Sequence, residues 1–153
     1  MNKQKLFLTF FYSGLAPKAP GTFGTLAGQL VGIGLLFLIH MNTFALLMVV
    51  ISVVGILEIN KYEKISGEHD NSWIVIDEVA GIWLAMTLVP FDPLSMVLVF
   101  AFFRLYDIWK PSLIGRIDRD VKGGLGVMGD DLLAGVLAGL STLLVMEGVQ
   151  TFI

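Results

Sequence analysis

Apolar residues fill five long stretches of the chain, and short polar segments separate one stretch from the next. The apolar stretches cover residues 23–39, 44–59, 74–89, 94–109 and 132–149. Each is about 16 to 18 residues long, shorter than the ~20 residues that a helix needs to cross a bilayer. The pattern predicts an all-α membrane protein with a single domain over residues 1–153, a bundle of about five short transmembrane or membrane-embedded helices. A soluble helical core is the alternative, because the stretches are short.

A further apolar run, residues 6–12, lies close to the N-terminus behind Lys3 and Lys5. A signal peptide begins in a similar way, but the Gly-Leu-Ala-Pro-Lys-Ala-Pro-Gly-Thr that follows offers no convincing cleavage site. We therefore expect a retained segment that lies at the membrane interface. Four aromatic side chains would anchor it there, namely Phe7, Phe10, Phe11 and Tyr12.

Glycine recurs every four residues in the first and the last apolar stretch. The positions are Gly24, Gly28 and Gly32, and then Gly135 and Gly139. This spacing lets the backbones of neighbouring helices approach closely in a membrane. We predict that these glycines are helix contacts.

The composition agrees with a membrane protein. Only 15% of the residues are charged and 56% are hydrophobic, whereas soluble domains carry about 25% charged residues. The net charge of -3 and the lack of a basic tail give no sign of a nucleic-acid partner. The chain has no cysteine, which excludes disulfides, thiolate metal sites and a cysteine nucleophile.

The basic residues predict an orientation for the bundle. If the stretches cross in alternate directions and the N-terminus is cytoplasmic, all 10 Lys and Arg residues fall on the cytoplasmic side. The positive-inside rule expects such a distribution. We therefore predict a multi-pass protein with a cytoplasmic N-terminus and an external C-terminus.

Four of the predicted helices carry acidic residues at the same, cytoplasmic end. These residues are Glu58, Asp77, Glu78, Asp107, Asp130 and Asp131. A charge within a span costs about 2.5–3.5 kcal/mol even on lenient scales, so such residues usually mark function. Simpler explanations stay open for some of them: Glu58 as an interfacial charge, Asp130 or Asp131 as a helix cap, and Asp107 as an ion-pair partner of Arg104.

Clustered carboxylates repel one another unless a cation lies among them. Without cysteine or a suitable histidine cluster, the ligands are all oxygen, which suits Mg²⁺ or Mn²⁺. We predict that the catalytic and metal-binding residues are Asp77, Glu78, Asp107, Asp130 and Asp131, with Mg²⁺ as the cofactor.

Basic residues and glycines near these acids are candidates for binding a phosphate group. A glycine-rich loop that enters a helix can offer backbone N–H groups to an anion, and the run after Lys122 predicts such a loop. Residues 18–25 are either a second phosphate loop or a Pro/Gly helix entry, and His69 is either a general base or a solvated side chain. The predicted phosphate-binding residues are Lys18, Arg104, Lys110, Lys122, Gly123 and Gly124.

Four sequence blocks together resemble the phosphatidylglycerophosphatase A family. They are PKAPGTFGT at 17–25, IDEVAG at 76–81, FRLYDIWKP at 103–111 and DRDVKGGLGVMGDDLLAG at 118–135. The blocks follow one another in family order and cover almost the whole chain.

The resemblance implies a Mg²⁺-dependent lipid phosphatase of the bacterial cytoplasmic membrane, which converts phosphatidylglycerophosphate to phosphatidylglycerol and phosphate. The oligomeric state, the number of metal ions and the attacking group, water or carboxylate, are left open. A small transport or ion-binding membrane protein is the alternative, since carboxylates within spans also make cation pathways. The collection of charge at one end favours chemistry at the membrane surface over transport.

Overall fold

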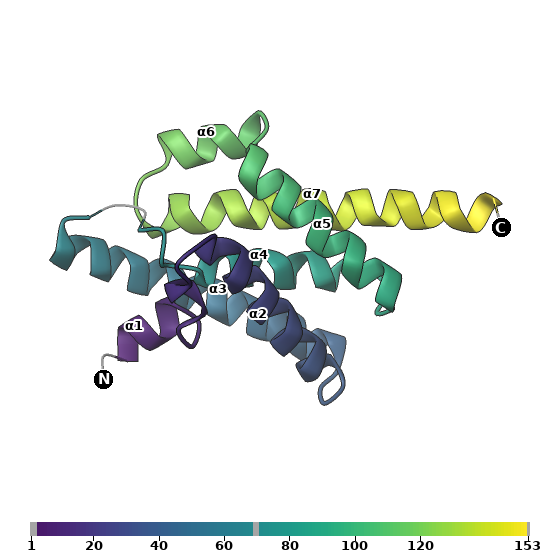
Figure 1. The fold of residues 1–153 in the computed structure, drawn as a ribbon, viewed down its shortest axis with the longest axis horizontal. Coiled ribbons are helices and arrows are strands. Elements are labelled where there is room, and N and C mark those ends of the chain that lie inside the picture. Colours follow the sequence, from purple (N-terminus) through teal and green to yellow (C-terminus); the bar gives the residue numbers. More distant parts are fainter. Residues whose placement is uncertain (1–2, 69–70, 153) are drawn as a thin grey trace.

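The computed structural model describes residues 3–68 and 71–152, and all regular structure in these ranges is helical (Figure 1). In chain order the helices are α1 (Lys3–Leu8), the 3-10 helix η1 (Ser13–Leu15), α2 (Pro20–Leu36), α3 (Met41–Ser66), α4 (Ile76–Thr87), α5 (Pro93–Trp109), α6 (Leu113–Asp120) and α7 (Gly124–Phe152). The predicted all-α class is confirmed. Each of the five apolar stretches forms one helix, namely α2, α3, α4, α5 and α7.

Fewer helices than expected are long and apolar enough to cross a membrane. In the described ranges two helices meet these criteria, α3 over Met41–Ser66 and α7 over Gly124–Val149. The prediction of five spans is therefore supported for two. At the other extreme, α4 has 12 residues and a length of about 18 Å. Pro90 limits α4 because the residue before a proline avoids helical geometry.

The short helix α4 lies at the centre of the molecule, in contact with α2, α3, α5 and α7 (Figure 1). Its side chains are buried on all sides, and Trp83 is the largest of them. The Trp83 indole N–H donates a hydrogen bond to the Gly28 carbonyl of α2 at 2.7 Å. After its first turn, which carries Asp77 and Glu78, α4 is apolar on all sides. A helix of this kind needs such complete coverage, so α4 forms the core.

The regularly spaced glycines are the places where α2 and α7 pack against α4. A Cβ atom on Gly28 would lie 2.9 Å from Val79 Cγ2, and one on Gly139 would lie 2.8 Å from Leu88 Cδ1. Real Cβ contacts are essentially never this short. The predicted role of these glycines in helix contacts is thus confirmed.

The N-terminal segment is attached to the core rather than lying beside it. The Val75 N–H donates to the Leu8 carbonyl at 2.9 Å, and Phe10 is buried, edge-on to Trp83. The expectation that Phe10 is an interfacial anchor is therefore wrong, because its ring completes the core. Phe11 and Tyr12 are exposed, as an interfacial segment requires.

Candidate functional site

A cavity of about 310 Å³ opens where the first residues of α2, α4 and α7 meet the end of α5 and α6. Its size is at the lower end of the ~300–1,000 Å³ typical of small-molecule sites. The lining includes all five carboxylates that the sequence predicted as catalytic, together with two of the predicted cations: Asp77, Glu78, Asp107, Asp130, Asp131, Arg104 and Lys110. These seven residues come from α4, α5 and α7, with Lys110 directly after α5, and they converge as expected.

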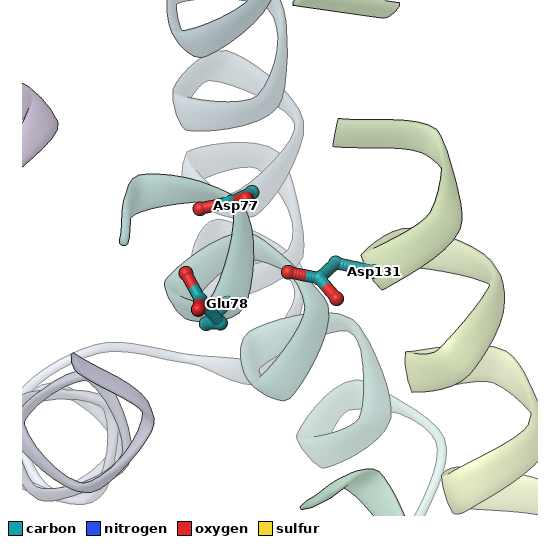
Figure 2. Close-up of side chains that lie close together, drawn as sticks. All are labelled: Asp77, Glu78 and Asp131. Atoms are coloured by element: carbon teal, nitrogen blue, oxygen red, sulfur yellow. The ribbon is translucent and has the colours of Figure 1, made fainter. Parts of the chain in front are cut away.

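Three of the carboxylates, Asp77, Glu78 and Asp131, form an acidic triad (Figure 2). Asp77 and Glu78 come from the first turn of α4, and Asp131 points toward them from α7. Each residue offers an oxygen that lies within 4.8 Å of the other two. In the described ranges no basic side chain forms an ion pair with any of the three.

The acidic triad has the donor set and the unused oxygens that a hard cation requires. Asp77 Oδ1 and Glu78 Oε2 are buried, and neither has a hydrogen-bond partner among the described residues. An unpartnered buried carboxylate oxygen is costly, and the three carboxylates of the triad, when ionised, repel one another at this separation. Carboxylate oxygens in this number suit Mg²⁺, so the residues fit a divalent ion.

The position of Asp131 depends on where α7 begins. Asn60 of α3 accepts a hydrogen bond from the Gly124 N–H at 2.8 Å, which caps the helix there. Asp130 and Asp131 therefore lie almost two turns inside α7. The expectation that one of them caps the last helix is wrong, and so is the expectation of a glycine-rich loop before it. Gly124, Gly126 and Gly129 are helical, whereas Gly123 directly precedes the helix with φ 75°. Gly124 packs directly against the α3 backbone.

Arg104 and Asp107 form an ion pair within the last turns of α5, and both side chains are largely buried. The Arg104 guanidinium also donates to the Thr25 hydroxyl of α2, at 3.4 Å. Thr25 in turn donates to the Gly21 carbonyl at 2.7 Å. The ion pair that the sequence offered as a simple explanation exists, and it lies in the cavity wall.

Lys110 joins two other carboxylates. Its ammonium donates to Asp118 at 2.8 Å and to Asp130. Burial lowers the pKa of Lys110, but these two hydrogen bonds outweigh burial and raise the pKa above its ordinary value of 10.5. Lys110 has a left-handed backbone with φ 46° as the C-cap of α5, a conformation that non-glycine residues adopt rarely and often at functional sites. It is a fixed cation at the cavity.

Several predicted phosphate-binding residues do not line the cavity. Lys18 and Lys122 are exposed, while Gly123 and Gly124 lie against Asn60 and α3. Their predicted role has no support from the geometry. Residues 18–25 are the Pro/Gly entry to α2, with Pro20 in its first turn. Glu58 is outside the cavity and accepts a hydrogen bond from Gln4, and His69 lies outside the described residues.

Two polar residues of this site were not predicted from the sequence. Asp118 of α6 accepts a hydrogen bond from Lys110, and Thr25 of α2 accepts one from Arg104. The strongly amphipathic pattern of α6 was the available signal for Asp118, because its polar face had to point either to solvent or to the charged cavity. Thr25 ends the segment 18–25, but nothing in that segment predicts its hydrogen bond to Arg104, which is distant in sequence.

Comparison with known proteins identifies the family. The family model described as Phosphatidylglycerophosphatase A matches residues 6–146. The chain is 36% identical to the Phosphatidylglycerophosphatase A of Escherichia coli K12, covering 90% of this chain and 80% of the relative, and 35% identical to that of Haemophilus influenzae, covering 90% and 85%. It is also 41% identical, over 84% of each chain, to a Bacteroides thetaiotaomicron protein with the provisional name phosphatidylinositol-3-phosphatase.

No solved structure matches the chain. The family match includes every helix that contributes to the cavity, and the two phosphatidylglycerophosphatases cover most of the chain at more than 30% identity. The chain therefore belongs to the phosphatidylglycerophosphatase A family.

Proposed function

We propose that this protein hydrolyses the terminal phosphomonoester of phosphatidylglycerophosphate, giving phosphatidylglycerol and phosphate. One observation carries the proposal: in a chain of this family, the acidic triad and two fixed cations line one cavity. A phosphomonoester needs both elements, because the dianion hydrolyses extremely slowly unless its charge is neutralised.

The acidic triad, Asp77, Glu78 and Asp131, would hold Mg²⁺. When bound, the ion would offset the charge of the phosphate and orient the attacking oxygen. The support is the oxygen-only donor set and the two buried carboxylate oxygens that lack partners among the described residues.

Arg104 and Lys110 would bind the phosphate oxygens directly. An ammonium has three N–H donors and Lys110 uses two of them, on Asp118 and Asp130. A guanidinium has five, and Arg104 uses one nitrogen, Nη1, for both of its described hydrogen bonds. Each cation thus keeps a donor for substrate. Asp107 and Asp130 would orient these cations, in place of the direct metal contact that the sequence suggested for all five acids.

We favour water as the attacking group, because the carboxylates of the acidic triad then remain available as metal ligands. The alternative is a carboxylate that takes up the phosphoryl group. Acid quenching during turnover distinguishes the two, since a phosphorylated aspartate recovered on the protein would contradict attack by water.

We further propose that the cavity faces the cytoplasm in a bacterial membrane. The positive-inside rule supports this orientation, because the cations of the cavity and of α6 lie at one end of the molecule. α2, α4 and α5 would be embedded beside the two long helices. The transport alternative is less well supported, since it needs charged groups along the membrane depth.

Phosphatidylinositol 3-phosphate is a second candidate substrate beside phosphatidylglycerophosphate, because a relative carries the provisional name phosphatidylinositol-3-phosphatase. The test is phosphate release by the purified protein in detergent, from phosphatidylglycerophosphate and from phosphatidylinositol 3-phosphate, each with Mg²⁺ or with EDTA. We expect Mg²⁺-dependent release with a higher kcat/KM for phosphatidylglycerophosphate. A preference for the inositol lipid would overturn the substrate, and full activity in EDTA would overturn the metal.

A further inference from the structure

α2 and α5 lie side by side and antiparallel, and three contacts fix their register. A Cβ atom on Gly21 would lie 3.4 Å from Arg104 Nη1, and the Thr25 hydroxyl accepts from the same nitrogen. Further along, the Gln29 side-chain amide donates to the Met96 carbonyl at 2.7 Å. From Gly21 to Gln29 the chain advances 29 - 21 = 8 residues, and from Arg104 to Met96 it goes back 104 - 96 = 8. One continuous seam therefore leaves the cavity.

An apolar groove of about 270 Å³ follows this seam beyond the cavity. Its lining comes from both helices and consists of Leu26, Gln29, Ile33, Met96, Val97 and Phe100. The polar member, Gln29, already uses its amide in the hydrogen bond to α5. Phe100 is one helical turn, about 6 Å, from Arg104, so the groove begins where the charged cavity ends.

We propose that this groove binds one acyl chain of the substrate phospholipid while the headgroup phosphate lies between Arg104 and Lys110. The inference rests on the proposed function, because a phospholipid presents a phosphate and an acyl chain in one molecule. Gly21 and Ile33 are 12 residues apart in α2, about 18 Å along the helix, so the seam can follow much of a chain. Leu26 and Val97 are 42% and 66% exposed, which leaves the groove open to the surrounding lipid.

The continuity with the cavity distinguishes this groove from another apolar one. That second groove is lined by α1 and the residues after it, by α2 and α3, and by Trp83 of α4, and it includes Phe7 and Phe11. It is on a different side of α2 and does not approach α5. A lipid there could not place its phosphate in the charged cavity, so the substrate chain is assigned to the seam between α2 and α5.

The test fills the groove and compares substrates with and without acyl chains. Val97→Trp adds bulk within the groove, and Val53→Trp is the matched control on an exposed position of α3. The substrates are dipalmitoyl phosphatidylglycerophosphate in mixed micelles and its deacylated, water-soluble headgroup. We expect Val97→Trp to lower kcat/KM for the dipalmitoyl lipid about tenfold, the scale of discrimination in apolar pockets, and to leave the deacylated substrate unchanged.

Leu26→Trp, on the facing helix, should produce the same selective loss, and the melting temperature in detergent shows whether each variant is folded. Equal losses on both substrates, or a loss in Val53→Trp as large as in Val97→Trp, would overturn the groove assignment. A wild-type protein that hydrolyses neither substrate would instead overturn the proposed function. The two failures are therefore distinguishable.

Discussion

The carboxylates of the cavity fall into two groups, those that are paired with Lys110 or Arg104 and those that are not. Asp118 and Asp130 are hydrogen-bonded to the Lys110 ammonium, and Asp107 is paired with Arg104. The members of the acidic triad have no such cation among the described residues. In the proposed function the first group orients cations for the phosphate, and the second group binds the metal ion.

Asp118→Asn tests the first group without touching the acidic triad. The change weakens one charge-assisted hydrogen bond of Lys110, and since Asp118 is about one-third exposed, we expect a loss of about 1 kcal/mol, or about fivefold in kcat/KM. Asp120→Asn, on the same helix but outside the cavity, is the matched control and should be unaffected. Similar activities for the two variants, in a phosphate-release assay, would show that Asp118 has no positioning role.

How well each of these residues could be predicted from the sequence depended on whether a local sequence rule applied to it. Carboxylates within or bordering apolar stretches are expensive, so Asp77, Glu78 and Asp131 were candidates from the sequence alone. The phosphate-binding prediction for Gly123 and Gly124, which the geometry does not support, followed from the rule that a glycine run usually forms a loop. Here the missing side chains allow α7 to pack against α3, a tertiary contact that no local pattern reveals.

At the scale of elements, the crossing of α4 and α7 sets the geometry of the acidic triad. A Cβ atom on Gly135 of α7 would collide with the Gly81 carbonyl of α4, one turn beyond Asp131. Glycine spacing predicted the contact, but the length of α4 and the early start of α7 depended on Pro90 and on the cap from Asn60.

Gly135→Val should therefore separate the two helices. We expect destabilisation of at least about 1–3 kcal/mol, the usual cost of overpacking, together with loss of activity as Asp131 moves away from α4. Gly148→Val is the control on the same helix, because a Cβ atom there would meet nothing within 4 Å. Thermal unfolding in detergent measures both variants, and equal melting temperatures would contradict the close crossing.

The cap of α5 gives a pH-dependent prediction. Asp92 accepts hydrogen bonds from the Ser95 hydroxyl at 2.6 Å and the Ser95 N–H at 3.0 Å, and these bonds lower its pKa below the ordinary 3.8. Because the folded-state pKa is the lower one, the stabilisation is complete above the unfolded-state value and is lost as pH falls through the folded-state value. Asp92→Asn should thus lower the melting temperature at pH 7, with a difference that shrinks below pH 3.8. A difference independent of pH would contradict a charged cap.

At the scale of the whole molecule, the charged cavity lies at one end, and the proposed orientation places that end in the cytoplasm. The absence of cysteine makes single-cysteine labelling in intact cells direct. We expect a membrane-impermeant maleimide to label His40→Cys, between α2 and α3, and to label Asp120→Cys in α6 only after the membrane is opened. Labelling of Asp120→Cys in intact cells would reverse the orientation.

We propose that the acidic triad is the metal-dependent centre of a lipid phosphatase, and this assignment can be tested directly. The most direct measurement is phosphate release from phosphatidylglycerophosphate by wild type, Asp131→Asn and the exposed control Glu147→Gln, with Mn²⁺ binding followed by EPR on the same samples. We expect Asp131→Asn to lose activity and to bind Mn²⁺ about 100-fold more weakly, since even outer-shell partners of a metal contribute about 10- to 100-fold, while Glu147→Gln resembles wild type. Wild-type activity and Mn²⁺ affinity in Asp131→Asn would contradict the account.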